Sequence, residues 1–312
     1  MTRRSGPADP VTARRPDGAW QPVSDCGPGC LPAPGEQPGV TPLRAAARLG
    51  ALLVALGLGV GLVGVLPLLP SGARGAAGRA WARTVAGALG ITVVVRGRAL
   101  RAGGALLVAN HSSWLDVVAL LAVAPTRLLA KREVRRWPLV GPLATVAGTV
   151  FLDRRRLRTL PRTVGKVAAA LRAGRPVAVF PEGTTWCGRS TGGFRPALFQ
   201  AAIDATVPVV PVRIAYHCAV TGAETTVAGF LGDESLWRSV RRVLSSRDLT
   251  ITVTVLAALH PAAGADRRRL AGVAESALRL RAPGGRVGPV RAADCPDTGR
   301  GGLVLSRCIA LA

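Results

Sequence analysis

The chain has 312 residues, of which 49% are hydrophobic, and its formal net charge at pH 7 is +24. A chain of this length can bury one substantial core and still carry tails or an anchor. So large a basic surplus requires an anionic counterpart, such as nucleic acid, an anionic bilayer or a phosphorylated ligand. Aromatic residues make up only 4% of the chain, and no helix-turn-helix or zinc-finger pattern occurs, so a bilayer is favoured over nucleic acid.

The N-terminal part of the chain divides into a polar stretch and an apolar one. Residues 1–42 are rich in Pro, Gly and polar residues, and we expect a disordered tail there. From Leu49 to Leu69 no side chain is charged, and about 20 such residues suffice to cross the hydrocarbon core as a helix. We therefore expect a membrane-anchoring segment over residues 43–73.

The topology of this anchor stays open from sequence alone. Five glycines and Pro67 soften the segment, so it is either one spanning helix or a helical hairpin within one leaflet. Arginines flank it on both sides, so the positive-inside rule gives little guidance. More positive charge follows the segment than precedes it, which favours a catalytic domain on the cytoplasmic face of the cell membrane.

After the anchor, strand-like and helix-like segments alternate. The expected strands are Ile91–Arg96, Ala105–Ala109, Thr149–Leu152, Pro176–Phe180, Val209–Ala215 and Thr250–Leu256. The expected helices are Asp116–Val123, Thr159–Ala173, Ala197–Ala205 and Asp266–Leu280. This alternation predicts an α/β domain over residues 74–282, with a mixed, mostly parallel sheet flanked by helices, followed by a low-order C-terminal tail over residues 283–312.

A histidine and an aspartate lie five residues apart where a predicted strand turns into a predicted helix. The segment runs Asn110-His111-Ser112-Ser113-Trp114-Leu115-Asp116. If His111 lies in the turn and Asp116 in the first helical turn, the carboxylate can fix the imidazole tautomer and make the other ring nitrogen a better base. Such a base can take a proton from a hydroxyl that attacks a carbonyl. From spacing alone, capping of the helix by the polar residues explains the segment equally well.

Two further blocks follow predicted strands. Phe180-Pro181-Glu182-Gly183-Thr184-Thr185 places a carboxylate and a glycine at the carboxyl end of a strand, where ligands bind in open α/β sheets. Val150-Phe151-Leu152-Asp153 is followed by three arginines, Arg154, Arg155 and Arg156, which can clamp a phosphate. Taken singly, the first is also an ordinary turn and the second a solvated basic loop.

The six cysteines indicate neither a metal site nor a disulfide framework. They occur at positions 26, 30, 187, 218, 295 and 308, and the two that lie closest are spaced C-x3-C without nearby histidines. We therefore expect free thiols and no metal ion.

Together the motifs resemble those of the glycerolipid acyltransferase family, whose bacterial members include the 1-acyl-sn-glycerol-3-phosphate acyltransferases. The matching residues are Asn110, His111 and Asp116; Phe151, Asp153 and Arg154; Phe180 to Thr184; and Val207, Pro208 and Pro211. These four motifs occur in the family's order over roughly residues 75–260.

The resemblance implies a role for each matching residue. His111 would be the general base on the acceptor hydroxyl and Asp116 its orienting partner. Arg154 would bind the acceptor's phosphate, while Glu182, Gly183 and Thr184 would shape the acceptor site. The side of the pocket that takes the acyl donor would be supported by Pro208 and Pro211.

The implied reaction moves a fatty acyl group from acyl-CoA or acyl carrier protein to the free hydroxyl of 1-acyl-sn-glycerol-3-phosphate. The product would be phosphatidic acid, made for phospholipid biosynthesis from membrane lipids. No cofactor is implied, because the thioester donor is already activated.

One departure from the family pattern concerns the acceptor. Members with phosphate acceptors commonly carry Arg after F-P-E-G-T, whereas this chain has Thr185. Members that acylate lyso-ornithine lipid also show F-P-E-G-T-T, so that acceptor is the alternative. Arg189 and Arg195 are candidates to supply the missing charge.

Two other functional classes compete with this interpretation. Gly188-Arg189-Ser190-Thr191-Gly192 fits G-x-S-x-G, the nucleophile elbow of serine hydrolases, with Asp233 and His260 as candidate partners. That elbow requires a strand running directly into the serine and a helix directly after it. The other class is a non-enzymatic, membrane-anchored binder of anionic lipid or nucleic acid, which the charge alone suggests.

Overall fold

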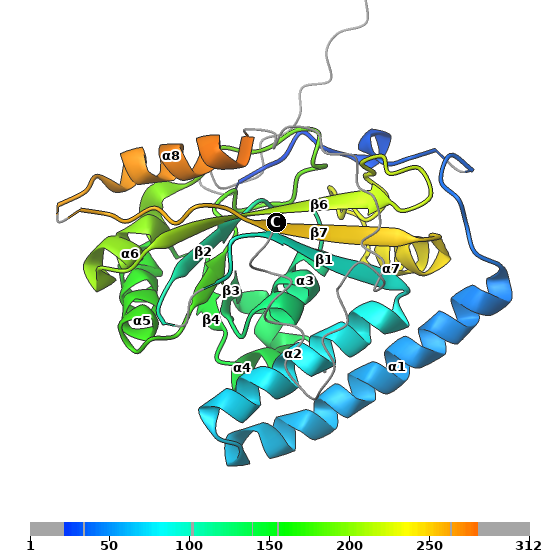
Figure 1. The fold of residues 1–312 in the computed structure, drawn as a ribbon, viewed down its shortest axis with the longest axis horizontal. Helices are drawn as coiled ribbons and strands as arrows, with labels where there is room; N and C mark the ends of the chain where they lie inside the picture. Colours follow the sequence, from blue (N-terminus) through cyan, green and yellow to red (C-terminus); the bar gives the residue numbers. More distant parts are fainter. Residues whose placement is uncertain are drawn as a thin grey trace, which may run out of the picture.

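The computed structural model describes residues 22–33, 35–100, 103–138, 140–154, 156–262 and 264–279. Seven strands form one sheet in the order β1-β7-β6-β2-β5-β3-β4 (Figure 1). Their bounds are β1 Ile91–Gly97, β2 Leu106–Ala109, β3 Arg127–Lys131, β4 Val150–Leu152, β5 Val177–Val179, β6 Val209–Cys218 and β7 Leu249–Val255. All neighbouring pairs are parallel except β6 and β7, which confirms the predicted mixed, mostly parallel sheet.

Helices cover both faces of the sheet. They are α1 Pro42–Val65, α2 Ser71–Ala88, α3 Leu115–Val123, α4 Val140–Val146, α5 Leu160–Arg172, α6 Phe199–Ala205, α7 Leu236–Ser245 and α8 Arg267–Arg279. On β2, Leu107 and Ala109 pack in the core beneath α2, α3 and α7, while Leu106 and Val108 pack in the core beneath α5, α6 and α8. Because β2 is buried on both faces, it is a continuous apolar run rather than an alternating one.

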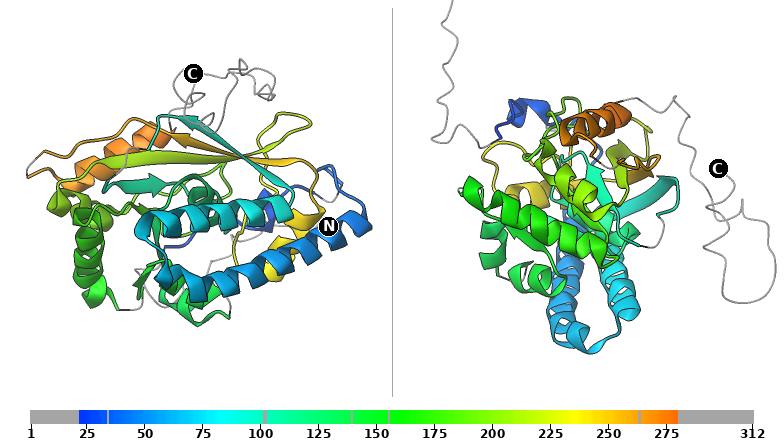
Figure 2. Two further views of the ribbon diagram at one scale, coloured as in Figure 1. Left: turned by 60° about the horizontal axis from the view of Figure 1, so that its bottom comes forward. Right: turned by 90° about the vertical axis from the view of Figure 1, so that its left-hand side faces the viewer.

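The apolar segment is the first arm of a helical pair. Helix α1 continues through a 3-10 turn at Leu66–Leu68, and α2 returns beside it (Figure 2). At the crossing, Trp81 Nε1 donates a hydrogen bond to the carbonyl of Ala55 at 2.8 Å, and the Trp81 ring fills the space above Gly59. Among the described residues, one helix, Pro42–Leu68, is long and apolar enough to cross a membrane, with a mean hydropathy of 2.5.

The first turns of α1 are attached to the α/β domain. The Arg48 guanidinium is buried and donates to the carbonyls of Leu244 at 3.0 Å and Ser246 at 2.6 Å, at the C-terminal end of α7. These carbonyls have no partner within the helix, so the cation satisfies them. The backbone N–H of Val40 donates to Ser245 just before α1 begins.

The sequence predicts a disordered tail up to residue 42, but the described part of that stretch lies against the domain. Cys26 is buried, a 3-10 turn spans Pro28–Cys30, and Thr226 donates to the Cys30 carbonyl at 2.7 Å. These contacts join segments far apart in the chain, so local composition could not reveal them. Residues 1–21 and the tail predicted over residues 283–312 lie outside the described residues.

The sheet brings the motifs to one edge. Strands β2, β5, β3 and β4 are parallel neighbours, so their carboxyl ends meet at the same edge. His111 follows β2, Glu182 follows β5, Lys131 ends β3 and Arg154 follows β4. Ligands bind at this edge of open α/β sheets, so the topology alone makes it the candidate site.

Candidate active site

The His111 imidazole is held in one orientation by two neighbours. Its Nδ1 lies 2.9 Å from Asp116 Oδ2, and its ring stacks on Phe180 with centroids 4.0 Å apart and an interplanar angle of 16°. The His111 side chain is 21% exposed, whereas that of Asp116 is 0% exposed. The aspartate is thus shielded from solvent, whereas the imidazole is partly exposed. Asp116 contacts Nδ1, so Nε2 is the ring nitrogen that remains for a substrate.

Asp116 is a fully buried carboxylate with four donors. Its Oδ2 accepts the backbone N–H groups of Ser112 at 2.7 Å and Ser113 at 2.9 Å, in addition to the contact with His111. Its Oδ1 accepts the hydroxyl of Tyr216. Burial of a charge is costly unless hydrogen bonds compensate it, and here both oxygens are engaged. As the sequence predicts, His111 lies in the turn and Asp116 in the first turn of the helix.

Tyr216 is a site residue that sequence reasoning misses. It lies on β6, 100 residues from Asp116, and no motif marks it. Burial, followed by the negative charge of Asp116, raises the pKa of the Tyr216 phenol well above its usual value. The phenol therefore stays protonated and remains a donor to the carboxylate.

Asn110 connects the motif to the sheet. Its amide donates to the Ile214 carbonyl at 2.9 Å and accepts from the Ile214 N–H at 2.8 Å. These two bonds continue the β2–β6 ladder by one step after β2 has ended. The turn that carries His111 is therefore fixed to a central strand.

Glu182 joins the two loops of the site. Its Oε2 accepts the N–H of His111 at 2.7 Å, and its Oε1 accepts the N–H of Gly192 at 3.3 Å. Burial raises the pKa of Glu182 to about 8, although the two backbone donors act in the opposite direction. Both oxygens serve the protein backbone, so the contact with an acceptor that the resemblance implies stays a prediction.

Two cations, Arg154 and Arg195, lie beside Gly183. Arg154 Nη1 donates to the Gly183 carbonyl at 2.5 Å, and a Cβ built on Gly183 would lie 3.5 Å from Arg195 Nε. Burial lowers the pKa of Arg154, Glu133 raises it, and the neighbouring charge of Arg195 lowers it further. Burial, and then the charge of Arg154, also lowers the pKa of Lys131. We call these three basic residues, together with Glu133, the cation cluster.

The backbone conformation at position 183 explains why this turn has a glycine. Gly183 has φ = +76°, which L side chains rarely adopt, and a Cβ there would stand 2.8 Å from Pro22 Cγ. Thr184, the next residue, is partly buried in the same turn. The Thr185 hydroxyl donates to the Phe230 carbonyl at 2.5 Å, so the residue that stands in place of the usual arginine bonds to a distant loop.

The two motif prolines are part of the sheet or directly precede it. Pro208 accepts the N–H of Leu106 at 3.0 Å, and Pro211 accepts the N–H of Leu256 at 2.9 Å. Pro211 also pairs with Val108 in the β2–β6 register. Their predicted support of the donor side stays a prediction.

The serine-hydrolase interpretation lacks its structural context. Strand β5 ends at Val179, well before Ser190, and no helix follows the serine before the short turn at Pro196–Leu198. Ser190 instead donates its N–H to the sulfur of Cys187 at 3.4 Å. An elbow needs strand, nucleophile and helix in direct succession, so this loop is not one.

Comparisons with known proteins identify the family to which the chain belongs. Residues 91–215 match the acyltransferase family. The chain is 39% identical over 244 residues to a lyso-ornithine lipid O-acyltransferase of Pseudomonas aeruginosa, an alignment that covers 76% of this chain and 92% of that protein. It is 36% identical over 176 residues to a 1-acyl-sn-glycerol-3-phosphate acyltransferase of Neisseria gonorrhoeae, covering 56% of this chain and 68% of the other.

The fold also has a solved counterpart. The crystal structure of a 1-acyl-sn-glycerophosphate acyltransferase from Thermotoga maritima superposes with a TM-score of 0.59 at 21% identity, covering 76% of this chain and 92% of that one. At this identity the likeness concerns the fold alone.

Proposed function

Since the chain belongs to the acyltransferase family that includes these lysolipid acyltransferases, we propose that it acylates the free hydroxyl of 1-acyl-sn-glycerol-3-phosphate to give phosphatidic acid. The observation that carries the proposal is the His111–Asp116 pair at 2.9 Å, on the same sheet edge as the cation cluster. The pair supplies a base for a hydroxyl, and the cluster supplies positive charge for a phosphate.

His111 acts as the general base in this mechanism. Nε2 takes the proton of the acceptor hydroxyl while the oxygen attacks the thioester carbonyl. The new C–O ester bond forms, the C–S bond breaks, and the proton passes from the imidazole to the departing thiolate. The buried Asp116 carboxylate stabilises the imidazolium between these steps, and positioned bases of this kind contribute roughly 10²–10⁴ in rate.

The cation cluster favours a phosphate as the acceptor's head group. Lys131, Arg154 and Arg195 are basic, and Glu133 is an acid that interacts with Lys131 and Arg154. A phosphate monoester carries about −1.5 to −2 at pH 7, so nearby cations attract it strongly. In this proposal Arg195 supplies the cation that Thr185 does not provide.

Lyso-ornithine lipid is the second candidate acceptor. Thr185 places a hydroxyl where phosphate-acceptor members have an arginine, and the relative that aligns over 92% of its length is named a lyso-ornithine lipid O-acyltransferase. The α-carboxylate of lyso-ornithine lipid would bind the same cations, and its free hydroxyl would lie against His111. A zwitterionic head group carries no net charge and is attracted to these cations less strongly than a phosphate is, so this acceptor stands second.

The proposed setting is the cell membrane, with α1 inserted into one leaflet. Large apolar side chains on α1 and the turn after it are exposed, namely Leu53, Val54, Leu58, Val60, Val65 and Leu68. Both ends of the α1–α2 pair contact the domain, since Arg48 is bonded to α7 and α2 packs on α3. An anchor whose two ends return to one domain fits a hairpin better than a full span. The cytoplasmic face and an acyl-CoA or acyl carrier protein donor remain parts of the proposal.

The test compares acceptors and one matched pair of variants. Purified protein in vesicles receives labelled acyl-CoA with either 1-acyl-sn-glycerol-3-phosphate or lyso-ornithine lipid. We expect labelled phosphatidate, and a KM for the phosphate acceptor that rises roughly tenfold to a hundredfold in Arg195→Gln, as expected for a lost charge-assisted bond. The control is Arg189→Gln, because Arg189 is not part of the cation cluster and lines a pocket with Pro32, Glu36 and Glu224. Label only in ornithine lipid would reject the first acceptor in favour of the second, and label in neither would overturn both.

A further inference from the structure

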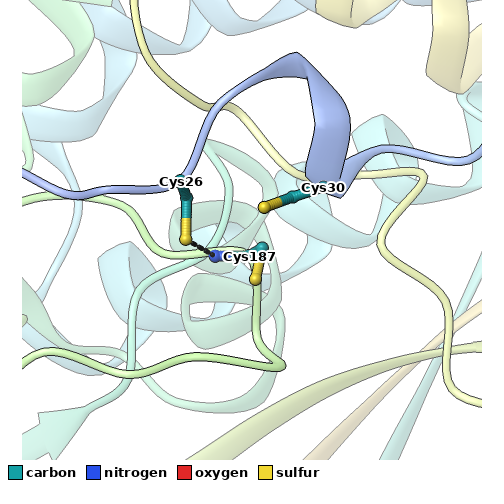
Figure 3. A group of neighbouring side chains, drawn as sticks. All are labelled: Cys26, Cys30 and Cys187. Atoms are coloured by element: carbon teal, nitrogen blue, oxygen red, sulfur yellow. Dashed lines mark hydrogen bonds between the residues drawn. The ribbon is translucent and has the colours of Figure 1, made fainter. Parts of the chain in front are cut away.

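Three cysteines that are far apart in the sequence meet at one point. Cys26 and Cys30 lie on the N-terminal segment, and Cys187 lies on the loop that follows Thr185 (Figure 3). Their sulfur atoms all lie within 4.8 Å of one another, Cys26 and Cys187 are buried, and Cys30 is half-buried. All three are free thiols.

We propose that these thiols form a binding site for a soft divalent metal ion, of which Zn²⁺ is the representative. Zinc–sulfur bonds of about 2.3 Å place tetrahedral sulfur ligands roughly 3.8 Å apart, so small side-chain rotations would complete the geometry. A disulfide would use only two of the three sulfurs and would require about 2.05 Å between them. The convergence of three soft ligands thus favours a metal ion.

Backbone donors point at the sulfur atoms. Cys187 donates its N–H to Cys26 Sγ at 3.4 Å, and Ser190 donates its N–H to Cys187 Sγ at 3.4 Å. The second bond depends on a tight turn in which Gly188 has φ = +88°. Hydrogen bonds to the charged form of an acid favour that form, and the thiolate is the form that binds metals.

The group supplies three ligands among the described residues, which leaves one position of a tetrahedral ion for water or another ligand. Apolar side chains close the surroundings, since Leu31, Trp186 and Leu231 pack against the cysteines. Such a shell limits solvent access and strengthens metal–thiolate bonds. The proposal departs from the sequence-based expectation of free thiols, because the C-x3-C spacing does not show that Cys187 is adjacent.

The ion would link the N-terminal segment, through Cys26 and Cys30, to the active-site loop that carries Cys187. Pro22, four residues before Cys26, stands against Gly183. On the other side, Trp186 donates its N–H to the His111 carbonyl at 2.8 Å, one residue before Cys187. A metal bound by the three cysteines would therefore hold together segments that flank both His111 and the cation cluster.

The test measures metal binding on the full chain purified in detergent or vesicles. With Zn²⁺ we expect one equivalent per chain by elemental analysis. With Co²⁺ we expect the sulfur-to-metal charge-transfer band and the intense visible bands of a tetrahedral thiolate site. Cys30→Ser, which changes the most exposed ligand, should abolish the charge-transfer band or reduce it by about one third, because one of the three thiolates is lost. The matched control is Cys218→Ser, a buried free thiol outside the group, which should bind as wild type does.

A second measurement does not depend on variants that may misfold. In the wild-type chain, Zn²⁺ should protect Cys26, Cys30 and Cys187 from alkylation, and a chelator should expose them, while Cys218 is unaffected. The double variant that carries serine at positions 295 and 308 in place of the two C-terminal cysteines should keep the metal.

Three outcomes would overturn the proposal. The first is that neither ion binds at micromolar concentration, and the second is a Cys26–Cys187 disulfide in the isolated protein. The third is loss of metal binding in the C-terminal double variant, which would place the ligands outside the group. None of these outcomes depends on acyl transfer, so the proposed function is tested separately.

Discussion

The exchange Asp116→Asn removes the charge behind His111 while keeping the shape of the side chain. One oxygen of Asp116 accepts from His111, Ser112 and Ser113, and the other accepts from Tyr216. The asparagine must turn its oxygen to the three donors and its NH2 to the Tyr216 hydroxyl, which can rotate and accept. The imidazole tautomer is thereby preserved, and only the charge is lost.

The size of the effect follows from this orientation. Hydrogen bonds to charged groups contribute about 1.5–3 kcal/mol against about 0.5–1.5 for neutral ones, so roughly 1–2 kcal/mol is lost. At about 1.4 kcal/mol per factor of ten, kcat should fall roughly fivefold to thirtyfold. A wrong tautomer would instead cost about 10⁴.

The assay is steady-state acyl transfer from labelled acyl-CoA in vesicles, with folding of each variant checked by circular dichroism. Tyr216→Phe is the matched control, because it leaves the charge of Asp116 in place and should lower kcat by less than about tenfold. A fall near 10⁴ in Asp116→Asn would refute the proposed orientation of the amide. Unchanged turnover would refute a role of the carboxylate in catalysis.

Two further predictions concern stability. The folded-state pKa of Glu182, about 8, lies above the ordinary value of 4.5, so the folded chain holds one more proton than the unfolded chain between these values, and the melting temperature should fall as pH rises through this window. In Glu182→Gln this part of the pH dependence should disappear, and a wild-type-like slope in thermal unfolding would contradict it. In the helical pair, Gly59→Leu places its Cβ about 2.6 Å from Trp81 Nε1 and should cost about 1–3 kcal/mol, whereas Gly57→Leu, with nothing within 4 Å, should unfold like wild type. Equal melting temperatures for the two variants would show that the α1–α2 contact is absent.

The sequence predicts the central elements of the fold because their local signals are strong. Strands β1, β2, β5, β6 and β7 are rich in Val, Ile and Leu, and α5 has a clear amphipathic period. Strand β3 and helix α7 are absent from the predicted elements. Strand β3 is a five-residue segment with a cation at each end, so its local signal is weak. Helix α7 does carry a local signal, because it has a pronounced amphipathic period and Ser235 caps its N-terminus, so this helix is predictable from the sequence.

The candidate site likewise contains residues that the sequence marks and residues that only the fold reveals. His111, Asp116 and Glu182 belong to short motifs whose combination and order resemble those of a known family, so the sequence marks them as candidates. Tyr216 and Lys131 reach the site from strands whose order in the sheet cannot be read from the sequence, since β6 lies beside β2 and β3 beside β5.

The cysteine group was missed for a similar reason. Cys187 is separated from Cys26 by 161 residues. Only the packing of the N-terminal segment on the domain brings the sulfur atoms together.

The most direct measurement of the central claim is the rate of acyl transfer by His111→Ala in a folded preparation. We expect kcat to fall by roughly 10²–10⁴, because the variant lacks the base that takes the hydroxyl proton. His260→Ala, which changes an exposed histidine outside the site, should retain wild-type turnover. If His111→Ala transfers acyl groups as fast as His260→Ala does, the imidazole is not the base and the proposed mechanism is wrong.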